Sequence, residues 1–398
     1  MRHLLLTLTV LALTVVAAAD AAATVARTTI GDVPRTYTHF MNAQEAALCR
    51  ANAAAGGLSA YFFNPAVIAN LQGVSGQATM RANMKSRNYL PDELDASDDM
   101  FLFSQAMAVK HNDTYALGFG YSSPSYRNLE LVGLQDGASY HGEFHGSLRF
   151  FEMLAAAKIG QEGQGAIGFA VGIANLDEGA EESGTDGRYI RTAQMDGIAA
   201  SVAMGMTFDA TERLTFGLGY RFSTSVDVEG EWHTESGGEV TKGTTKTAPV
   251  AVGGVRFTPV DNYTLYASYI HEGWDKAKST FAAYYPTDDN EDCNENDGAR
   301  DEFDGALGTA AVGGEGALLD GRLTVRAGFS MPIGSGPDST DEPEYRKLVP
   351  EYAAGFGGTL KFEQYSVEAA LVRERYADGD EGAQVVNHGI YVTVGYEF

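Results

Sequence analysis

The sequence predicts an all-β protein: a 14-stranded antiparallel transmembrane β-barrel with an N-terminal, partly helical hatch in its lumen. Three observations lead to this fold class. Large apolar residues alternate with small or polar ones in segments along most of the chain, as in strands that present two different faces. These segments number 14, an even count, and the connections between them alternate strictly between short and long.

The chain begins with the features of a secretory signal peptide. A short basic start is followed by an apolar run over residues 4–16, and alanine triplets then offer cleavage after Ala19 or Ala23. This run is shorter than the roughly 20 apolar residues that a membrane-spanning helix needs. We therefore expect residues 1–23 to be a signal peptide. No later apolar stretch is long enough for such a helix, so the exported chain is either soluble or a β-barrel.

Residues 24–73 do not alternate. The stretch from Glu45 to Gly57 is rich in alanine, which favours a partly helical structure. About 50 residues are few for a separate domain, so we expect this segment to form the hatch, or plug, inside the barrel. We interpret Cys49 as a small buried residue. Export to an oxidising compartment leaves open a bridge to Cys293, the second of the two cysteines.

Residues 74–398 are expected to form the barrel. In the segment 198–208, Ile198, Val202 and Phe208 fall on one face, and the other face holds only Ala, Ser, Gly and Thr. A soluble sandwich would place charged residues on its outer face, whereas this pattern indicates a lipid-facing belt around a crowded interior. The chain has 47 glycines, more than an average composition gives, and the surplus lies largely on the small-residue face of these strands. The expected strands are 74–88, 100–110, 114–122, 145–159, 164–176, 193–208, 213–230, 247–258, 262–274, 303–316, 321–330, 351–362, 365–376 and 387–398.

The long connections are expected on the extracellular side and the short turns on the other, as is typical of outer-membrane barrels. Several long connections are acidic. We interpret them as solvated loops, tied loosely to cations bound by lipopolysaccharide, and not as metal sites. The long connections are expected at 89–99, 123–144, 177–192, 231–246, 275–302, 331–350 and 377–386.

The end of the chain supports the same fold. Thr393–Phe398 combines a polar residue, a glycine, two aromatic residues two positions apart and a terminal Phe, directly after an alternating strand. This hexad resembles the recognition strand that the outer-membrane barrel assembly machinery reads. We therefore expect that machinery to be a partner of the chain.

Several motifs together resemble the long-chain fatty acid transporter (FadL/TodX) family of outer-membrane proteins. Asn64-Pro65-Ala66, preceded by two phenylalanines, stands directly before the first expected strand, and further matches lie at 115–124, 212–223 and 323–329. The resemblance implies diffusive uptake of hydrophobic compounds, long-chain fatty acids or aromatic hydrocarbons, through a barrel that the hatch blocks. The ligand would leave sideways through the wall.

The resemblance also implies roles for particular residues. Asn64, Pro65 and Ala66 map to the hatch elbow beside the lateral opening. Gly118 and Gly120, in the third expected strand, are candidates for the kink that opens the wall, because glycine lets a strand bend. An equally good alternative is that both glycines are ordinary small residues facing the lumen.

Three arginines are candidate anchors for a fatty acid headgroup. If the large apolar faces point to lipid, then Arg81, Arg221 and Arg326 point into the lumen. A guanidinium suits a carboxylate because its donors form a planar fork. The alternative, which we favour, is that these arginines pair with acidic residues of the lumen or with the hatch.

Other functions are weighed against the same sequence. The 28 basic residues against 53 acidic ones give a net charge of −25, which argues against nucleic acid as a partner. The eight histidines lack metal-ligand spacing, and no nucleophile elbow or nucleotide-binding loop is present, so we predict no catalytic residue, metal site, cofactor or enzyme.

The expected partners are a hydrophobic small molecule, outer-membrane lipid with lipopolysaccharide, and the assembly machinery. The expected location is the outer membrane of a Gram-negative bacterium. A surface adhesin or structural antigen, a role in protein secretion, and a general porin remain alternatives.

Overall fold

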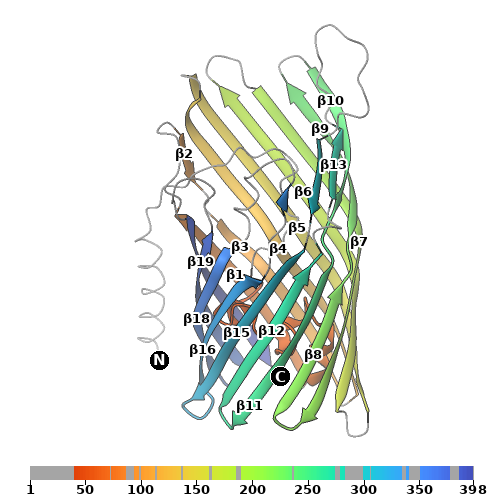
Figure 1. Cartoon of the computed structure of the whole chain (residues 1–398), viewed down its shortest axis with the longest axis vertical. Helices are drawn as coiled ribbons and strands as arrows, with labels where there is room; N and C mark the ends of the chain where they lie inside the picture. Colours follow the sequence, from red (N-terminus) through yellow and green to blue (C-terminus); the bar gives the residue numbers. More distant parts are fainter. Residues whose placement is uncertain are drawn as a thin grey trace.

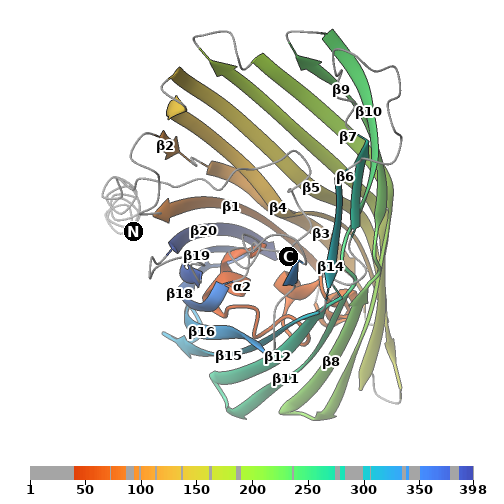
Figure 2. The same ribbon diagram turned by 45° about the horizontal axis from the view of Figure 1, so that its top comes forward.

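The computed structural model describes most of the chain after residue 39. The described residues are 40–71, 73–86, 94–97, 100–112, 114–135, 138–160, 164–184, 190–234, 237–273, 278–282, 299–304, 306–333, 338–339, 350–376 and 385–397. The expected signal peptide, Cys293 and Phe398 therefore lie outside the described residues. Antiparallel strands form one curved sheet, and the N-terminal described residues lie inside that curve (Figures 1 and 2).

The sheet is built from strands of very different length. The strands are β1 Val74–Ser86, β2 Leu94–Ser97, β3 Met100–His111, β4 Tyr115–Gln135, β5 Ala138–Ile159, β6 Gly165–Gly184, β7 Ile190–Thr211, β8 Leu214–Arg221, β9 Ser225–Thr234, β10 Gly237–Lys246, β11 Val250–Val260, β12 Tyr263–Glu272, β13 Lys278–Ala282, β14 Ala299–Asp304, β15 Leu307–Leu318, β16 Leu323–Ile333, β17 Asp338–Ser339, β18 Pro350–Phe362, β19 Tyr365–Tyr376 and β20 Val385–Glu397. All their pairings are antiparallel.

The expected set of 14 barrel strands is confirmed. Each strand pairs with the next in the order β1, β3, β4, β5, β6, β7, β8, β11, β12, β15, β16, β18, β19 and β20. The last strand, β20, also pairs with β1, from Ser75 opposite Glu397 to Ser86 opposite Val386. Among the described residues the pairings therefore return to the strand at which they began.

Several expected long loops are wrong, because strands occupy most of them. β4 and β5 together run through 123–144, β6 and β7 extend into 177–192, and β9 and β10 occupy most of 231–246. Strand pairing needs only backbone N–H and C=O groups, whatever the side chains are. The alternation on which the expectation rested marks only the lipid-facing part of a strand. Above that part outward residues are polar, as in the half-exposed Arg149–Asp177 pair at 3.7 Å.

Large apolar side chains cover the outer face of the sheet, as the alternation predicts. Phe119, Met153 and Ile198 are 67%, 66% and 62% exposed, although each is paired with a residue of a neighbouring strand. The residues between them point inward and are small, as Ala170 and Ala203 show, both with no exposed surface. Exposed apolar side chains over so wide a surface are stable in lipid and not in water.

Residues 40–71, called the inner segment below, contain short helices only. These are α2 (Ala43–Ala47) and the 3-10 helices η1 (Leu58–Ala60) and η2 (Pro65–Asn70). Asn42 begins α2: its Oδ1 accepts a hydrogen bond from Glu45 N at 2.8 Å, and Glu45 Oε2 accepts one from Met41 N at 3.0 Å. None of the helices in the described part of the chain has the length and apolarity to cross a membrane.

The inner segment contacts strands from all round the ring. Its first part packs on β18, β19 and β20, its middle on β12 and β15, and its last part on β3 to β7. Polar contacts follow the same path: Thr393 Oγ1 accepts from Ala43 N at 3.1 Å, and Ser268 Oγ donates to Arg50 O at 2.6 Å. Cys49 is buried, as predicted.

Candidate functional site

Inward-facing glycines allow the inner segment to lie directly on the wall. A methyl group added at Gly168 on β6 would come within 2.5 Å of Ala66 N, and one at Gly205 on β7 would overlap Asn64 Oδ1. Only glycine permits so close an approach of two backbones. Part of the glycine surplus therefore has a specific cause: the inner segment packs directly against the wall at these positions.

Asn64, Pro65 and Ala66 form the turn that leads into η2. Asn64 Oδ1 accepts from Ala66 N at 3.1 Å, while its Nδ2 donates to Ala54 O at 2.5 Å and to Met206 O at 3.0 Å. Pro65 occupies the first helical position, where the missing N–H costs no hydrogen bond. The turn is fully buried and binds both its own segment and β7.

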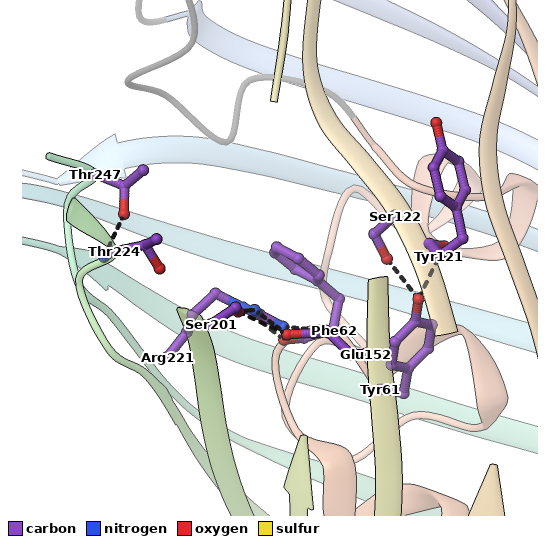
Figure 3. Close-up of polar contacts among 9 residues, drawn as sticks. All are labelled: Tyr61, Phe62, Tyr121, Ser122, Glu152, Ser201, Arg221, Thr224 and Thr247. Atoms are coloured by element: carbon purple, nitrogen blue, oxygen red, sulfur yellow. Dashed lines mark hydrogen bonds and ion pairs between the residues drawn. The ribbon is translucent and has the colours of Figure 1, made fainter. Parts of the chain in front are cut away.

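Arg221, at the end of β8, forms the most heavily bonded side-chain cluster of the described lumen (Figure 3). Its Nη1 and Nη2 donate to the two carboxylate oxygens of Glu152 on β5, at 2.6 and 3.0 Å. Nη1 also donates to Ser201 Oγ at 3.0 Å, and Nη2 donates to Phe62 O of the inner segment at 2.9 Å. The guanidinium carbon lies 3.8 Å from the Phe62 ring centroid.

The cluster is fully desolvated, since Arg221 has no exposed surface and Glu152 only 3%. A buried ion pair is tolerated only when hydrogen bonds occupy its remaining donors and acceptors, which Ser201 and the Phe62 carbonyl do here. Arg221 therefore ties the inner segment to the wall. This geometry matches the alternative in which a lumen acid and the hatch hold the arginine.

The three candidate arginines do not converge on one site. Arg326 on β16 donates through Nε to Glu315 Oε2 at 2.8 Å and through Nη1 to Thr359 Oγ1. Arg81 is buried on β1, opposite Tyr391 of β20. Because Glu152 already holds Arg221 and Glu315 already holds Arg326, these two guanidiniums do not share one acceptor.

The irregular point of β4 lies beyond the predicted glycines. Gly118 and Gly120 are paired regularly with both β3 and β5. The register shifts instead between Ser122 and Ser125, a stretch that contains Pro124. Proline lacks the N–H that a central strand needs, so it is the physical cause of the shift. The kink assigned to the glycines is corrected to this position.

A gap in the strand ladder starts at the same place. β3 pairs with β4 only as far as Gln105 opposite Ser122, and β2 resumes the pairing at Ser97 opposite Glu130. Within the described residues, 123–129 of β4 have no strand partner on that side, while β5 stays paired on the other. The wall therefore lacks backbone hydrogen bonds between β3 and β4 over this stretch.

Two clusters of buried residues in the lumen are apolar. Phe62 and Phe63 cluster with Leu148 and Phe150 of β5, with the Phe62 and Phe150 rings edge to face at 5.4 Å. A second cluster on β6, β7 and β9 consists of Leu176, Met195, Val226 and Val228. The described residues contain no group of His, Cys, Asp or Glu arranged to hold a metal ion. Such a lining suits apolar molecules.

Sequence reasoning missed Pro124, Glu152 and Tyr61. Pro124 falls in 123–144, which the sequence predicts to be a long connection, and a proline in a connection gives no sign of an irregular strand. Glu152 lies in the expected strand 145–159, and nothing in its local sequence marks it as a partner of an arginine. Its partner Arg221 lies 69 residues away, so no local pattern joins the two.

Neither a protein-family model nor a curated protein matches the sequence. Solved structures do resemble the fold, at low identity. The toluene transporter TbuX of Ralstonia pickettii superposes with a TM-score of 0.64 and 13% identity, covering 90% of this chain and 98% of that one. A FadL homologue of Pseudomonas aeruginosa gives 0.62 and 15%, with coverages of 90% and 98%. The CymD monoaromatic hydrocarbon channel gives 0.59 and 10%, with coverages of 90% and 97%. This chain therefore has the fold of the FadL and TodX channels, as its motifs predict.

Proposed function

We propose that this protein is an outer-membrane channel for diffusive uptake of hydrophobic compounds, either long-chain fatty acids or aromatic hydrocarbons. The observation that carries the proposal is the inner segment, which packs against strands from all round the ring. A general porin needs an open aqueous lumen. The inner segment, as part of the expected hatch 24–73, blocks the axial route, and Asn64-Pro65-Ala66 is its elbow.

The route of the ligand follows from the distribution of apolar surface. The apolar clusters around Phe62, Phe150 and Met195 capture the molecule on the extracellular side. It then leaves sideways between β3 and β4, where the ladder is interrupted after Ser122. On this path the ligand stays out of water and avoids the polar lipopolysaccharide leaflet. Flow follows the concentration gradient and needs no energy source.

The cellular setting belongs to the same proposal. Residues 1–23 direct export, and the strand that ends in Thr393–Phe398 is read by the assembly machinery. The wide apolar outer face supports residence in the outer membrane, with lipopolysaccharide around its upper part. Two of the solved structures named above are described as a toluene transporter and a monoaromatic hydrocarbon channel, which supports a hydrophobic cargo.

The headgroup role of the arginines gives a separate prediction. Because Glu315 holds Arg326, we expect Arg326→Ala to leave the ratio of fatty acid to toluene uptake unchanged. Both compounds are apolar, but only the fatty acid carries a carboxylate. Uptake of the two labelled compounds by the same cells measures the ratio. A selective loss of fatty acid uptake would assign the headgroup site to the altered arginine.

The proposal is tested by uptake into cells that lack their own channel for hydrophobic compounds. Expression of this chain should raise the initial uptake of labelled oleate or toluene several-fold and leave the uptake of a hydrophilic sugar unchanged. A surface adhesin or structural antigen would leave the uptake of all three compounds at the level of the empty vector. That result would refute the proposed function.

A further inference from the structure

Tyr61 of the inner segment stands where the gap in the wall begins. Its hydroxyl donates to the carbonyl of Tyr121 at 2.9 Å and shares a hydrogen bond of 2.5 Å with Ser122 Oγ (Figure 3). Ser122 forms the last rung of the β3–β4 ladder, opposite Gln105. The hydroxyl is therefore bound to the edge of the gap and not to a regular part of the wall.

The ring of Tyr61 lies against the strand at the same place. A methyl group added at Gly120 would come within 2.6 to 2.8 Å of ring atoms of Tyr61, closer than carbon atoms approach each other. Tyr61 has no exposed surface, and Ser122, Ser123 and Pro124 are buried as well. The side chain thus covers the inner side of β4 from Gly120 to the point where the ladder stops.

The next residue along the chain, Phe62, is held by a different part of the wall. Its carbonyl accepts from Arg221 at 2.9 Å, and the guanidinium of Arg221 lies over the Phe62 ring at 3.8 Å and over the neighbouring Phe150 ring at 4.8 Å. Consecutive residues share a peptide unit, so a displacement of Phe62 is transmitted to Tyr61. Phe62 also belongs to the apolar cluster that a hydrophobic ligand would meet first.

We propose that Tyr61 is the gate of the opening between β3 and β4, and that Arg221 keeps the gate closed through Phe62. An apolar ligand that competes for the aromatic contacts of Phe62 weakens the hold of Arg221 on Phe62. Phe62 then moves, and Tyr61 leaves the edge of β4. Arg221 acts here as a positioning residue. The inference rests on the proposed function, since a gate has a role only if ligand crosses the wall.

Two variants test the gate, one by changing Tyr61 and the other by changing the strand residue that Tyr61 contacts. Tyr61→Phe removes the two hydroxyl contacts and keeps the ring, whereas Gly120→Ala leaves Tyr61 intact and places a methyl group where the ring lies. The matched control is Tyr269→Phe, because Tyr269 is exposed on the outer face of β12. Folding of each variant is checked by the heat-dependent mobility shift of the barrel in detergent gels.

The readout is the initial rate of toluene entry into vesicles that contain the full chain and carry lipopolysaccharide in their outer leaflet, the polar barrier that an apolar molecule crosses slowly without a channel. We expect Tyr61→Phe and Gly120→Ala each to raise the rate about three- to tenfold, the range that corresponds to loss of about one net hydrogen bond. Tyr269→Phe should match the wild type. A wild type that transports, with both gate variants folded and no faster, overturns the gate and leaves the proposed function standing. A wild type that does not transport overturns both.

Discussion

Arg221→Met is expected to release the inner segment and to lower the free energy of unfolding by about 3–5 kcal/mol, because it leaves the Glu152 carboxylate buried without its counter-ion. The same change removes the two donors that hold Phe62 O. Urea unfolding in lipid measures the stability. Maleimide labelling of Cys49, in a background that carries Cys293→Ser, measures release, because this thiol is buried while the segment is in place.

Two controls separate the buried pair from a general effect of losing an arginine. Arg213→Met removes a half-exposed arginine whose contact with Asp261 spans 3.9 Å, and it should cost no more than about 1 kcal/mol. Arg221→Met combined with Glu152→Leu removes both charges and should recover most of the lost stability, since an apolar replacement of a buried ion pair is often neutral. Equal losses in the single and double variants would contradict this account of the cluster.

Gly205→Ala should displace the turn of Asn64 from β7. The added methyl group overlaps Asn64 Oδ1, so that both the capping bond to Ala66 N and the bond to Met206 O are lost. Overpacking of this kind costs about 1–3 kcal/mol. We expect faster labelling of Cys49 and a measurable ion conductance in planar bilayers, because the inner segment no longer seals against β7.

The matched control for this prediction is Gly253→Ala on the outer face of β11. There the nearest atom to an added methyl group is Leu218 Cδ2 at 3.3 Å, the end of a flexible side chain that is exposed. Both substitutions add one methyl group to a glycine in a barrel strand, but only the one at residue 205 meets the inner segment. Wild-type labelling and conductance in both variants would show that the inner segment keeps its position without a glycine at residue 205.

The fold could be predicted where the lipid imposes a pattern on the sequence. In β6, Ile167, Phe169 and Val171 alternate with small residues because one face meets lipid and the other meets the inner segment. Above the lipid the outward residues are polar, and the pattern no longer marks a strand. For this reason the sequence predicts a loop at 231–246, although backbone pairing continues through the end of β9 and the whole of β10.

The candidate site could be predicted only in part, because its contacts join residues far apart in the sequence. Asn64-Pro65-Ala66 is a local signal, and the turn is where the motif predicts it. The partners of Arg221 come from β5, β7 and the inner segment, and no spacing in the chain reveals which acid it meets. For Gly120 the sequence leaves two interpretations open, a kink in the strand and a small residue facing the lumen, and only the structure shows the close contact with the ring of Tyr61 that requires a residue without a side chain.

The central claim is that apolar molecules cross this barrel while no water-filled channel opens along its axis. Two measurements on one purified sample test it most directly. Toluene entry into vesicles with lipopolysaccharide in their outer leaflet and ion conductance in planar bilayers report the two routes separately. The account predicts toluene entry well above that of protein-free vesicles, together with no steady conductance. A steady conductance without accelerated toluene entry would contradict it and identify an open, water-filled pore.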